Sequence, residues 1–415
     1  MSLTMFEENL GIARTDILYT TKQVVFGLGS ISKVGEQAKQ LGGKKALVVT
    51  DKILRKILAD QIVESLKKQG LTSAVFDDIP GEPTVETLRS AASYVRESKF
   101  DVVVGVGGGA VIDTAKTCAI MATNPGDVKD YVATVEAPFE DHVKIKGLPL
   151  IVSPTTSGTG SENTGGIMVI DGDYKTWIAG PLCFPDVAIV DPALTLTLPP
   201  KMTAGSGMDA LSHAIEAYMI TALANPWIDA FALEATRLIT QNLRTAYHDG
   251  KNLQARYNMS WAAHLGGWVA MATSGPATLG HCLSEALGSK YKIPHGTICG
   301  ICLPHVMEFN LPAIMGRLAS IASAMGEDIT GLRPRDAALA AVRAVVELMK
   351  DTDIPVGLKA FRTPVGDIPK LAEYVVKDRQ RMYLLAKLHP RKLTVENLTQ
   401  TLENMWEGRL GESSA

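Results

Sequence analysis

The stretch DVVVGVGGGAVIDTAK, residues 101–116, decides the fold of the first half of the chain. It opens with a valine run typical of a strand that is buried on both faces of a parallel sheet. Three glycines follow, Gly107, Gly108 and Gly109, and a helical pattern begins directly after them. A strand, a tight turn and a helix in succession form the repeating unit of a doubly wound α/β domain.

Similar apolar runs, rich in β-branched residues, recur before residue 195 and alternate with helical stretches. They cover residues 44–51, 72–79, 148–155 and 187–191. We therefore expect an N-terminal α/β dinucleotide-binding domain with a parallel doubly wound sheet, residues 1–195. From about residue 196 strands fade and apolar stripes spaced by three or four residues dominate, as at Leu339, Val342, Val346 and Met349. This pattern predicts an all-α C-terminal domain, residues 196–415.

The glycine run is a candidate phosphate-binding loop. Glycines let the backbone approach a pyrophosphate, and the N-terminus of the next helix offers free N–H groups and a positive dipole end. We expect Asp113 to cap or brace this loop and Lys116 to add positive charge near the phosphates. The pattern GGGxxxD differs from the common GxGxxG, so a tight turn without a ligand is the competing interpretation.

Two short blocks in the second half, residues 207–218 and 280–296, hold a candidate metal site. Asp209 and His213 are four residues apart in a predicted helix, so both project from one face. His281 falls in a second predicted helix, and His295 follows a proline that ends it. One carboxylate and three imidazoles suit Fe²⁺ or Zn²⁺. An Asp-x3-His pair alone is more typical of a capped or solvent-facing helix.

Composition argues against several functional classes. The net charge of −3 is spread along the chain and no basic run indicates a nucleic-acid surface. The N-terminus lacks the pattern of a signal peptide, and we expect no apolar window of about 18 residues and no membrane span. Five cysteines favour a reducing cytoplasm. Cys299 and Cys302 lie in an apolar run and are interpreted as buried structural thiols.

Taken together, these motifs resemble those of the iron-containing (group III) alcohol dehydrogenase family. Two segments, DPALTLTLPPKMTAGSGMDALSHAIEAY at 191–218 and IPHGTICGICLPHVMEFN at 293–310, resemble its signatures. Residues 107–116 and 154–162 resemble the family's cofactor loops, residues 24–36 resemble its opening segment, and residues 389–394 resemble its closing motif. The resemblance covers nearly the whole chain. It implies the dehydroquinate synthase-like architecture of that family, which agrees with the predicted α/β domain followed by an all-α domain.

The resemblance also implies roles for individual residues. The metal ligands are Asp209, His213, His281 and His295, with Fe²⁺ as the ion and Zn²⁺ as the alternative. Asp51 ends the predicted strand at 44–51. The resemblance places it at the adenosine ribose, which implies NAD(H) in preference to NADP(H). Its competing interpretation is a helix N-cap, and both roles can coexist. The implied further contacts to the cofactor are Thr155, Thr156, Thr159, Ser161 and Lys175. Without the resemblance, residues 154–162 would be interpreted as a polar turn.

The function implied is that of a metal-dependent NAD(H) alcohol dehydrogenase or aldehyde reductase. Hydride would pass between the nicotinamide C4 and a primary alcohol or aldehyde held at the metal in the cleft between the domains. We expect a cytoplasmic homodimer or larger homo-oligomer that acts on a small molecule and binds neither nucleic acid nor membrane. The alternatives are a maleylacetate-reductase-like or a dehydroquinate-synthase-like enzyme, and a non-catalytic binding protein.

Glu285 marks one departure from the family pattern. Many relatives have a further histidine four residues after the third ligand, and here that position is Glu285. One helical turn from His281, it should face the same cleft. Three interpretations stay open: a proton relay, a selector of polar or cationic substrates, and a solvated helix residue.

Overall fold

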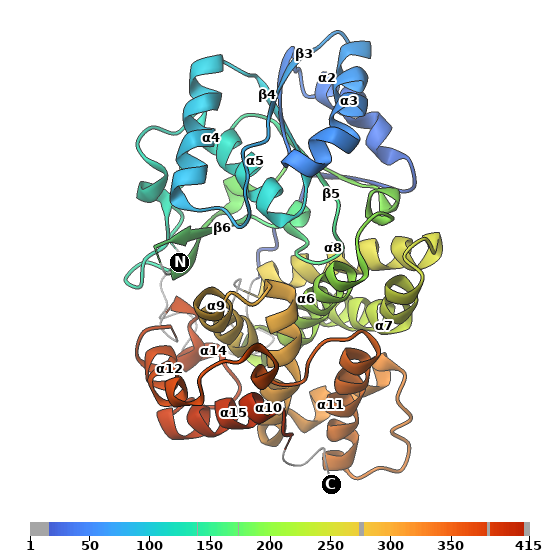
Figure 1. Cartoon of the computed structure of the whole chain (residues 1–415), viewed down its shortest axis with the longest axis vertical. Helices are drawn as coiled ribbons and strands as arrows, with labels where there is room; N and C mark the ends of the chain where they lie inside the picture. Colours follow the sequence, from blue (N-terminus) through green and yellow to red (C-terminus); the bar gives the residue numbers. More distant parts are fainter. Residues whose placement is uncertain (1–15, 139, 173, 274–277, 380–381, 411–415) are drawn as a thin grey trace.

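The computed structural model describes residues 16–138, 140–172, 174–273, 278–379 and 382–410. Figure 1 shows an upper part that contains the parallel sheet and a lower part built of long helices. Along the chain, the last strand of the sheet ends at Val190, and the first long helix of the lower part begins at Pro200. The predicted α/β half followed by an all-helical half is confirmed, whereas the domain limits of 1–195 and 196–415 stay a prediction.

Six parallel strands form the main sheet, in the order β1-β8-β5-β4-β2-β3. Their bounds are β1 (Gln23–Phe26), β2 (Lys45–Val49), β3 (Thr72–Phe76), β4 (Val102–Gly107), β5 (Leu150–Pro154) and β8 (Val187–Val190). All five predicted runs are strands of this sheet. The sequence pattern did not reveal the four-residue edge strand β1 or the antiparallel hairpin of β6 (Gly166–Asp171) and β7 (Tyr174–Ala179).

Helices cover both faces of the sheet, as a doubly wound fold requires. They are α2 (Val34–Gln40), α3 (Lys52–Lys68), α4 (Val85–Ser98) and α5 (Gly109–Met121). Leu47 and Val49 of β2 pack with α4 and α5, whereas Ala46 and Val48 pack with α2 and α3. Figure 1 shows the two pairs of helices on opposite sides of the sheet. Because both faces are covered, the strands are continuous apolar runs without alternation.

The chain reverses its direction across the sheet between β2 and β4. From β2 it moves outward to β3, and from β4 it moves through β5 towards the opposite edge. Ligands of open parallel sheets bind in the crevice at the carboxyl ends of the strands where this reversal occurs. Val49 pairs with Gly105, so the residues that follow β2 and β4 meet at this crevice.

The second half packs its helices around one large apolar core. The helices are α6 (Pro200–Met219), α7 (Pro226–His248), α8 (Leu253–Ala272), α9 (Leu279–Tyr291), α10 (His295–Met325), α11 (Pro334–Asp351), α12 (Ile368–Tyr374), α14 (Leu385–Leu388) and α15 (Val395–Glu407). Of the predicted stripe on α11, Leu339, Val342 and Met349 are buried and Val346 is partly buried.

Helix α10 corrects one expectation. It has 31 residues and contains a window with a mean hydropathy of 1.4, so the prediction that no such apolar window exists is wrong. Within the protein, 78% of that window is buried, and the helix contains Pro304 and Pro312 and a non-helical residue at Ile314. Burial of this extent is typical of a core helix, and α10 packs against α6 and α11 at the centre of the helical half.

Candidate metal and nucleotide site

The four predicted metal ligands converge on one carboxylate oxygen. Asp209 and His213 lie one turn apart on α6, His281 lies in the first turn of α9, and His295 begins α10. The Nε2 atoms of His295, His281 and His213 lie 3.5, 3.6 and 3.9 Å from Oδ1 of Asp209. Helix α6 and the later, consecutive helices α9 and α10 therefore place one carboxylate and three imidazoles together.

The distances from Asp209 to His295 and His281 fit a divalent cation, whereas the 3.9 Å to His213 is longer. Donor atoms at about 2.0–2.2 Å from a tetrahedral Zn²⁺ lie roughly 3.3–3.6 Å from one another. Oδ1 of Asp209 is buried and has no hydrogen-bond partner among the described residues. A buried carboxylate oxygen without a partner is costly unless a cation or a proton donor compensates it. The residues present therefore match the donor set that a metal ion requires.

Local electrostatics favour the metal-binding protonation state at Asp209, His213 and His295, but not at His281. Burial by itself raises the pKa of Asp209, but the three histidines outweigh burial and the pKa is lowered. Burial lowers the pKa of His213, and burial with the nearby Lys175 lowers that of His295 well below its usual range. Burial by itself lowers the pKa of His281, but Cys299, Glu216 and Asp209 outweigh burial and raise it well above its usual range. An ionised carboxylate and neutral imidazoles are the forms that ligate metals, so metal binding at His281 displaces a proton.

Glu216 orients one of the imidazoles. Its carboxylate accepts hydrogen bonds from Nδ1 of His281 at 2.8 Å and from the backbone N–H of His281 at 3.2 Å. A proton on Nδ1 leaves the Nε2 lone pair free to face Asp209. The sequence analysis missed Glu216. Its position seven residues after Asp209, on the same face of α6, is the signal that points to it.

Two glycines allow these helices to approach so closely. A Cβ on Gly296 would lie 2.1 Å from the carbonyl oxygen of Gly205, and one on Gly280 would lie 2.6 Å from the carboxylate of Glu216. Each glycine is the direct neighbour of a histidine of the cluster. Larger residues at these positions would move His295 or His281 away from α6.

The predicted phosphate loop lies at the crevice of the sheet. Gly107 ends β4, Gly108 is the N-cap of α5 without a capping side chain, and Gly109 is the first residue of α5. The backbone N–H of Thr155 donates to the carbonyl of Gly107 at 3.0 Å. A Cβ on Gly109 would lie 2.8 Å from the methyl group of Thr159. The turn of residues 154–162 therefore lies against the glycine turn.

Other residues of these loops bind one another. Asp113 is buried and accepts from the hydroxyl of Ser161 at 2.6 Å and from the N–H of Met168 at 2.9 Å, which are the contacts of a brace. Thr156 is partly exposed, and its methyl lies 3.7 Å from where a Cβ on Gly108 would be. The roles of Thr155, Thr156, Thr159 and Ser161 towards a cofactor stay predictions.

The expectation for Lys116 is wrong. Its side chain is fully buried, and Nζ donates to Ser161 Oγ at 3.0 Å, Thr164 Oγ1 at 3.1 Å and the carbonyl of Gly166 at 2.7 Å. Because these three acceptors hold the ammonium inside the protein, it ties α5 to the hairpin and does not face the crevice.

Asp51 is the N-cap of α3. Its Oδ1 accepts from the backbone N–H groups of Ile53 at 2.8 Å and Leu54 at 2.9 Å, so the capping interpretation is confirmed. The residue also lies at the reversal crevice, directly after β2. Its role at the ribose stays a prediction.

Lys175 on β7 connects the hairpin with the metal cluster. The side chain is 8% exposed and Nζ donates to Oε1 of Glu82 at 3.0 Å. The charge of Lys175 contributes to the lowered pKa of His295, which places the lysine in the electrostatic environment of the predicted metal ligands. Its contact with a ribose stays a prediction.

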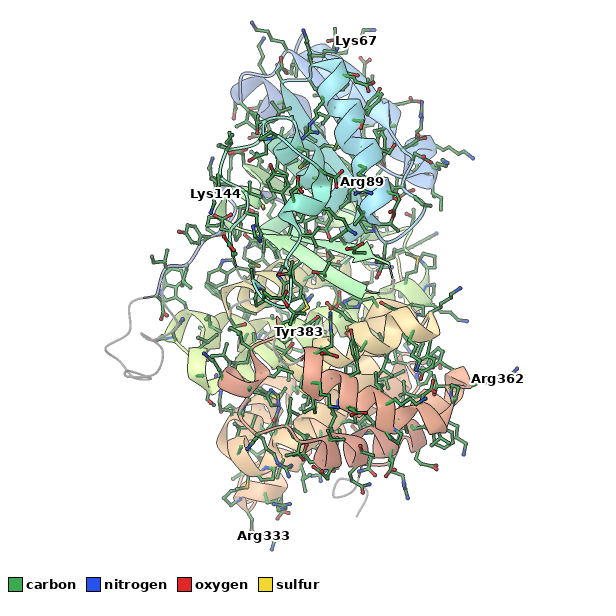
Figure 2. The ribbon with its side chains drawn as sticks, turned by 90° about the vertical axis from the view of Figure 1, so that its left-hand side faces the viewer. Lys67, Arg89, Lys144, Arg333, Arg362 and Tyr383 are labelled. Atoms are coloured by element: carbon green, nitrogen blue, oxygen red, sulfur yellow. The ribbon has the colours of Figure 1, made fainter. Side chains whose placement is uncertain are left out.

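Glu285 is not a solvated helix residue, because its side chain is only 3% exposed. Its Oε2 accepts from Nη2 of Arg379 at 2.8 Å and from the hydroxyl of Tyr383. Arg379 also donates from Nη1 to the carbonyl of Lys175 at 3.1 Å, and Tyr383 packs edge-on against Trp177. Figure 2 shows Tyr383 between the hairpin strands and the lower helices. The sequence analysis missed both Arg379 and Tyr383, and no motif marks them.

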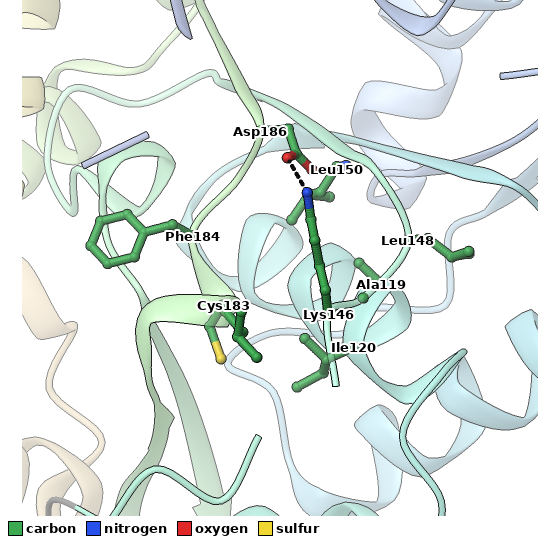
Figure 3. Close-up of a pocket in the computed structure, with 10 residues that line it drawn as sticks. Ala119, Ile120, Lys146, Leu148, Leu150, Cys183, Phe184 and Asp186 are labelled. Atoms are coloured by element: carbon green, nitrogen blue, oxygen red, sulfur yellow. Dashed lines mark hydrogen bonds and ion pairs between the residues drawn. The ribbon is translucent and has the colours of Figure 1, made fainter. Parts of the chain in front are cut away.

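A separate hollow in the α/β half contains none of the predicted site residues (Figure 3). Asp186 lines this hollow. Its carboxylate accepts hydrogen bonds from Lys146 at 2.8 Å, from Lys22 at 2.5 Å and from the N–H of Leu150 at 3.1 Å. These contacts satisfy the carboxylate, so its role is to join β8 to β5 and the neighbouring loops.

Comparisons with known proteins agree with this geometry. A family model described as "Iron-containing alcohol dehydrogenase" matches residues 21–192, and one described as "Fe-containing alcohol dehydrogenase family, C-terminal" matches residues 203–406. The 1,3-propanediol dehydrogenase of Klebsiella pneumoniae is 40% identical over 85% of this chain and 90% of its own length. The NAD-dependent methanol dehydrogenase of Bacillus methanolicus is 35% identical over 92% and 97%. A crystal structure of 1,3-propanediol oxidoreductase superposes with a TM-score of 0.88 at 36% identity, covering 95% of this chain and 100% of that one.

Proposed function

The chain belongs to the iron-containing alcohol dehydrogenase family, and we propose that it carries out its NAD-dependent alcohol and aldehyde redox reaction at the cluster of Asp209, His213, His281 and His295. The observation that supports this location is the buried Oδ1 of Asp209, which has no hydrogen-bond partner among the described residues and three imidazole nitrogens 3.5–3.9 Å away. Relatives that are named as alcohol dehydrogenases favour this function over a maleylacetate-reductase-like or a dehydroquinate-synthase-like enzyme.

The residues divide the work between the two halves of the protein. A divalent ion held by the cluster would supply Lewis acidity towards the substrate oxygen, and NAD(H) would supply the hydride chemistry. Asp209 provides the anionic donor, and Glu216 keeps Nε2 of His281 aimed at the cluster. At the crevice, the glycine turn and the N-terminus of α5 are suited to the cofactor phosphates.

We propose Fe²⁺ as the ion, with Zn²⁺ as the alternative, because oxygen and imidazole donors suit both. The substrate is proposed to be a primary alcohol or its aldehyde, and the protein to be a cytoplasmic homodimer or larger homo-oligomer. The family's description supports iron, and the names of the relatives support an alcohol substrate. Metal analysis, a substrate panel and light scattering test the ion, the substrate and the oligomeric state.

The direct test measures NADH oxidation by metal-stripped protein that is reloaded with Fe²⁺ or Zn²⁺, against short aldehydes. Turnover should require the metal and should fall more than about 100-fold in His281→Ala, because losing a ligand exceeds the 10–100-fold effect typical of residues that only orient one. His248→Ala, an exposed histidine of α7, is the matched control. Metal-independent turnover, or full activity of His281→Ala, would refute the location.

The preference for NAD(H) has a separate test in Asp51→Asn. Asparagine caps helices as well as aspartate does, so α3 should keep its N-terminus. The change removes a negative charge that would repel a 2′-phosphate by about 1–4 kcal/mol at ~4 Å. The ratio of kcat/KM for NADPH to that for NADH should therefore rise at least about fivefold. Asp78→Asn, an exposed control near the end of β3, should leave the ratio unchanged, and an unchanged ratio in Asp51→Asn would remove this role.

For Glu285 we propose a positioning role beside the proton-relay and substrate-selection hypotheses. Its carboxylate is engaged by Arg379 and Tyr383, and this triad links α9, which carries His281, to the segment around residue 379 and through Lys175 to the hairpin. Glu285→Gln distinguishes the roles. A relay predicts a changed pH profile of kcat/KM, whereas positioning predicts lower stability with the pH profile unchanged.

A further inference from the structure

Cys299 lies within the predicted metal cluster. It stands one turn after His295 on α10, and its side chain is buried. Its Sγ lies 3.7 Å from Nε2 of His295 and 3.9 Å from Nε2 of His281. Cys302 is also buried, as expected, but its Sγ contacts the sulfur of Met405 instead. The two thiols of the CxxC sequence therefore have different environments.

The thiol completes a compact group of four donors. One donor atom each from Asp209, His281, His295 and Cys299 lies within 4.8 Å of every other. His213 is not part of that group; its ring is stacked on that of His281 at 4.5 Å. The protein thus offers two sets of four donors that share three residues and differ in the fourth.

An independent observation shows that the centre of this group is suited to a cation. Oδ1 of Asp209 points into the cluster, its side chain is 3% exposed, and it has no hydrogen-bond partner among the described residues. The same buried oxygen is 3.5 Å from His295 and 3.6 Å from His281, the two histidines that also contact Cys299. The thiol therefore faces the position that an ion bound by Asp209 would occupy.

We propose that Cys299 is a metal ligand of this protein, in competition with His213 for the fourth position. This inference rests on the proposed metal site and adds a donor to it. On binding, the sulfur–metal bond forms and the thiol proton passes to solvent. Sulfur is a softer donor than oxygen or imidazole, so the Cys299 set favours Zn²⁺ over Fe²⁺, whereas the His213 set does not discriminate in this way.

Two anionic donors also change the charge at the site. With Asp209 and the Cys299 thiolate both bound, the charge of a divalent ion is fully compensated. A compensated ion is a weaker Lewis acid, so the sulfur-bound state should be less active than the state with His213 as the fourth ligand. Cys299 thereby makes the identity of the metal and the activity of the site interdependent.

The test uses Co²⁺ as a spectroscopic probe in the full-length protein. Metal-stripped protein loaded with Co²⁺ should show a sulfur-to-cobalt charge-transfer band in the near ultraviolet. Cys299→Ser and Cys299→Ala should lose the band while still binding Co²⁺, and Cys302→Ser, the matched buried thiol, should keep it. In competition titrations, Cys299→Ser should lower the affinity for Zn²⁺ relative to Fe²⁺ by about 10-fold or more.

The outcomes separate this inference from the proposed function. If wild-type protein binds Co²⁺ without a sulfur band and Cys299→Ser has the same spectrum, sulfur ligation is refuted and the Asp209 site stands. If wild-type protein binds neither Co²⁺, Zn²⁺ nor Fe²⁺, the metal site itself is refuted and the sulfur ligand with it. The absence of the band from wild-type protein refutes sulfur ligation even where a variant fails to fold, and two different Cys299 variants assign a band that is present.

Discussion

Replacing Asp209 with asparagine is expected to lower metal affinity and turnover more than any other single change in the cluster. The substitution keeps the size of the side chain but removes the carboxylate on which the three imidazoles converge. A residue that merely orients a ligand typically changes affinity 10–100-fold, so loss of this anionic donor should exceed about 100-fold. Bound metal is measured by elemental analysis and turnover by NADH oxidation.

A stability measurement distinguishes lost ligation from misfolding. A ligand that binds only the folded protein stabilises it, by about 2.7 kcal/mol when its concentration is 100 times Kd. Zn²⁺ should therefore raise the Tm of wild-type protein but not that of Asp209→Asn. Asp336→Asn, at an exposed carboxylate of α11, is the control and should respond like wild type. An Asp209→Asn variant with full metal content would contradict the site.

Replacing Arg379 with alanine is expected to destabilise the fold by about 3–5 kcal/mol, because it leaves Glu285 buried without its cation. Burial by itself lowers the pKa of Arg379, but Tyr383 and Glu285 outweigh burial and raise it, so the guanidinium is charged at every accessible pH. Arg379 and Glu285 are 4% and 3% exposed at the side chain, so solvent does little to screen their attraction. Urea unfolding of the variant and of wild-type protein measures this loss of unfolding free energy.

A double variant shows whether the ion pair causes that loss. Arg379→Met combined with Glu285→Gln removes both charges and leaves an amide oxygen as acceptor for the hydroxyl of Tyr383. Replacing both members of a buried pair is commonly close to neutral, so the double variant should be more stable than Arg379→Ala. Equal losses in both would mean that the bond from Arg379 to the carbonyl of Lys175, not the ion pair, holds this region together.

Local sequence patterns were sufficient for the architecture, whereas the list of candidate ligands also needed the family resemblance. Each strand of the parallel sheet except β1 is an apolar run that local sequence predicted, and the segment that carries Asp209 and His213 was predicted as a helix in the same way. These features depend on neighbours within a few residues. The exceptions are less buried: the residues of the edge strand β1 are exposed or partly buried, and along β6 of the hairpin buried residues alternate with partly buried ones.

Only the tertiary structure decided which distant residues meet. Helix packing brings Glu216 to His281, Arg379 to Glu285, and Cys299 to His295 and His281. Arg379, for example, lies 94 residues from Glu285 in the sequence. Packing also turned Lys116 inward, although its sequence context indicated a phosphate loop. By itself, the sequence determined the two halves and, through a family resemblance, the candidate ligands of the metal site. The tertiary structure decided the surroundings of that site, because no short-range period encodes contacts between helices.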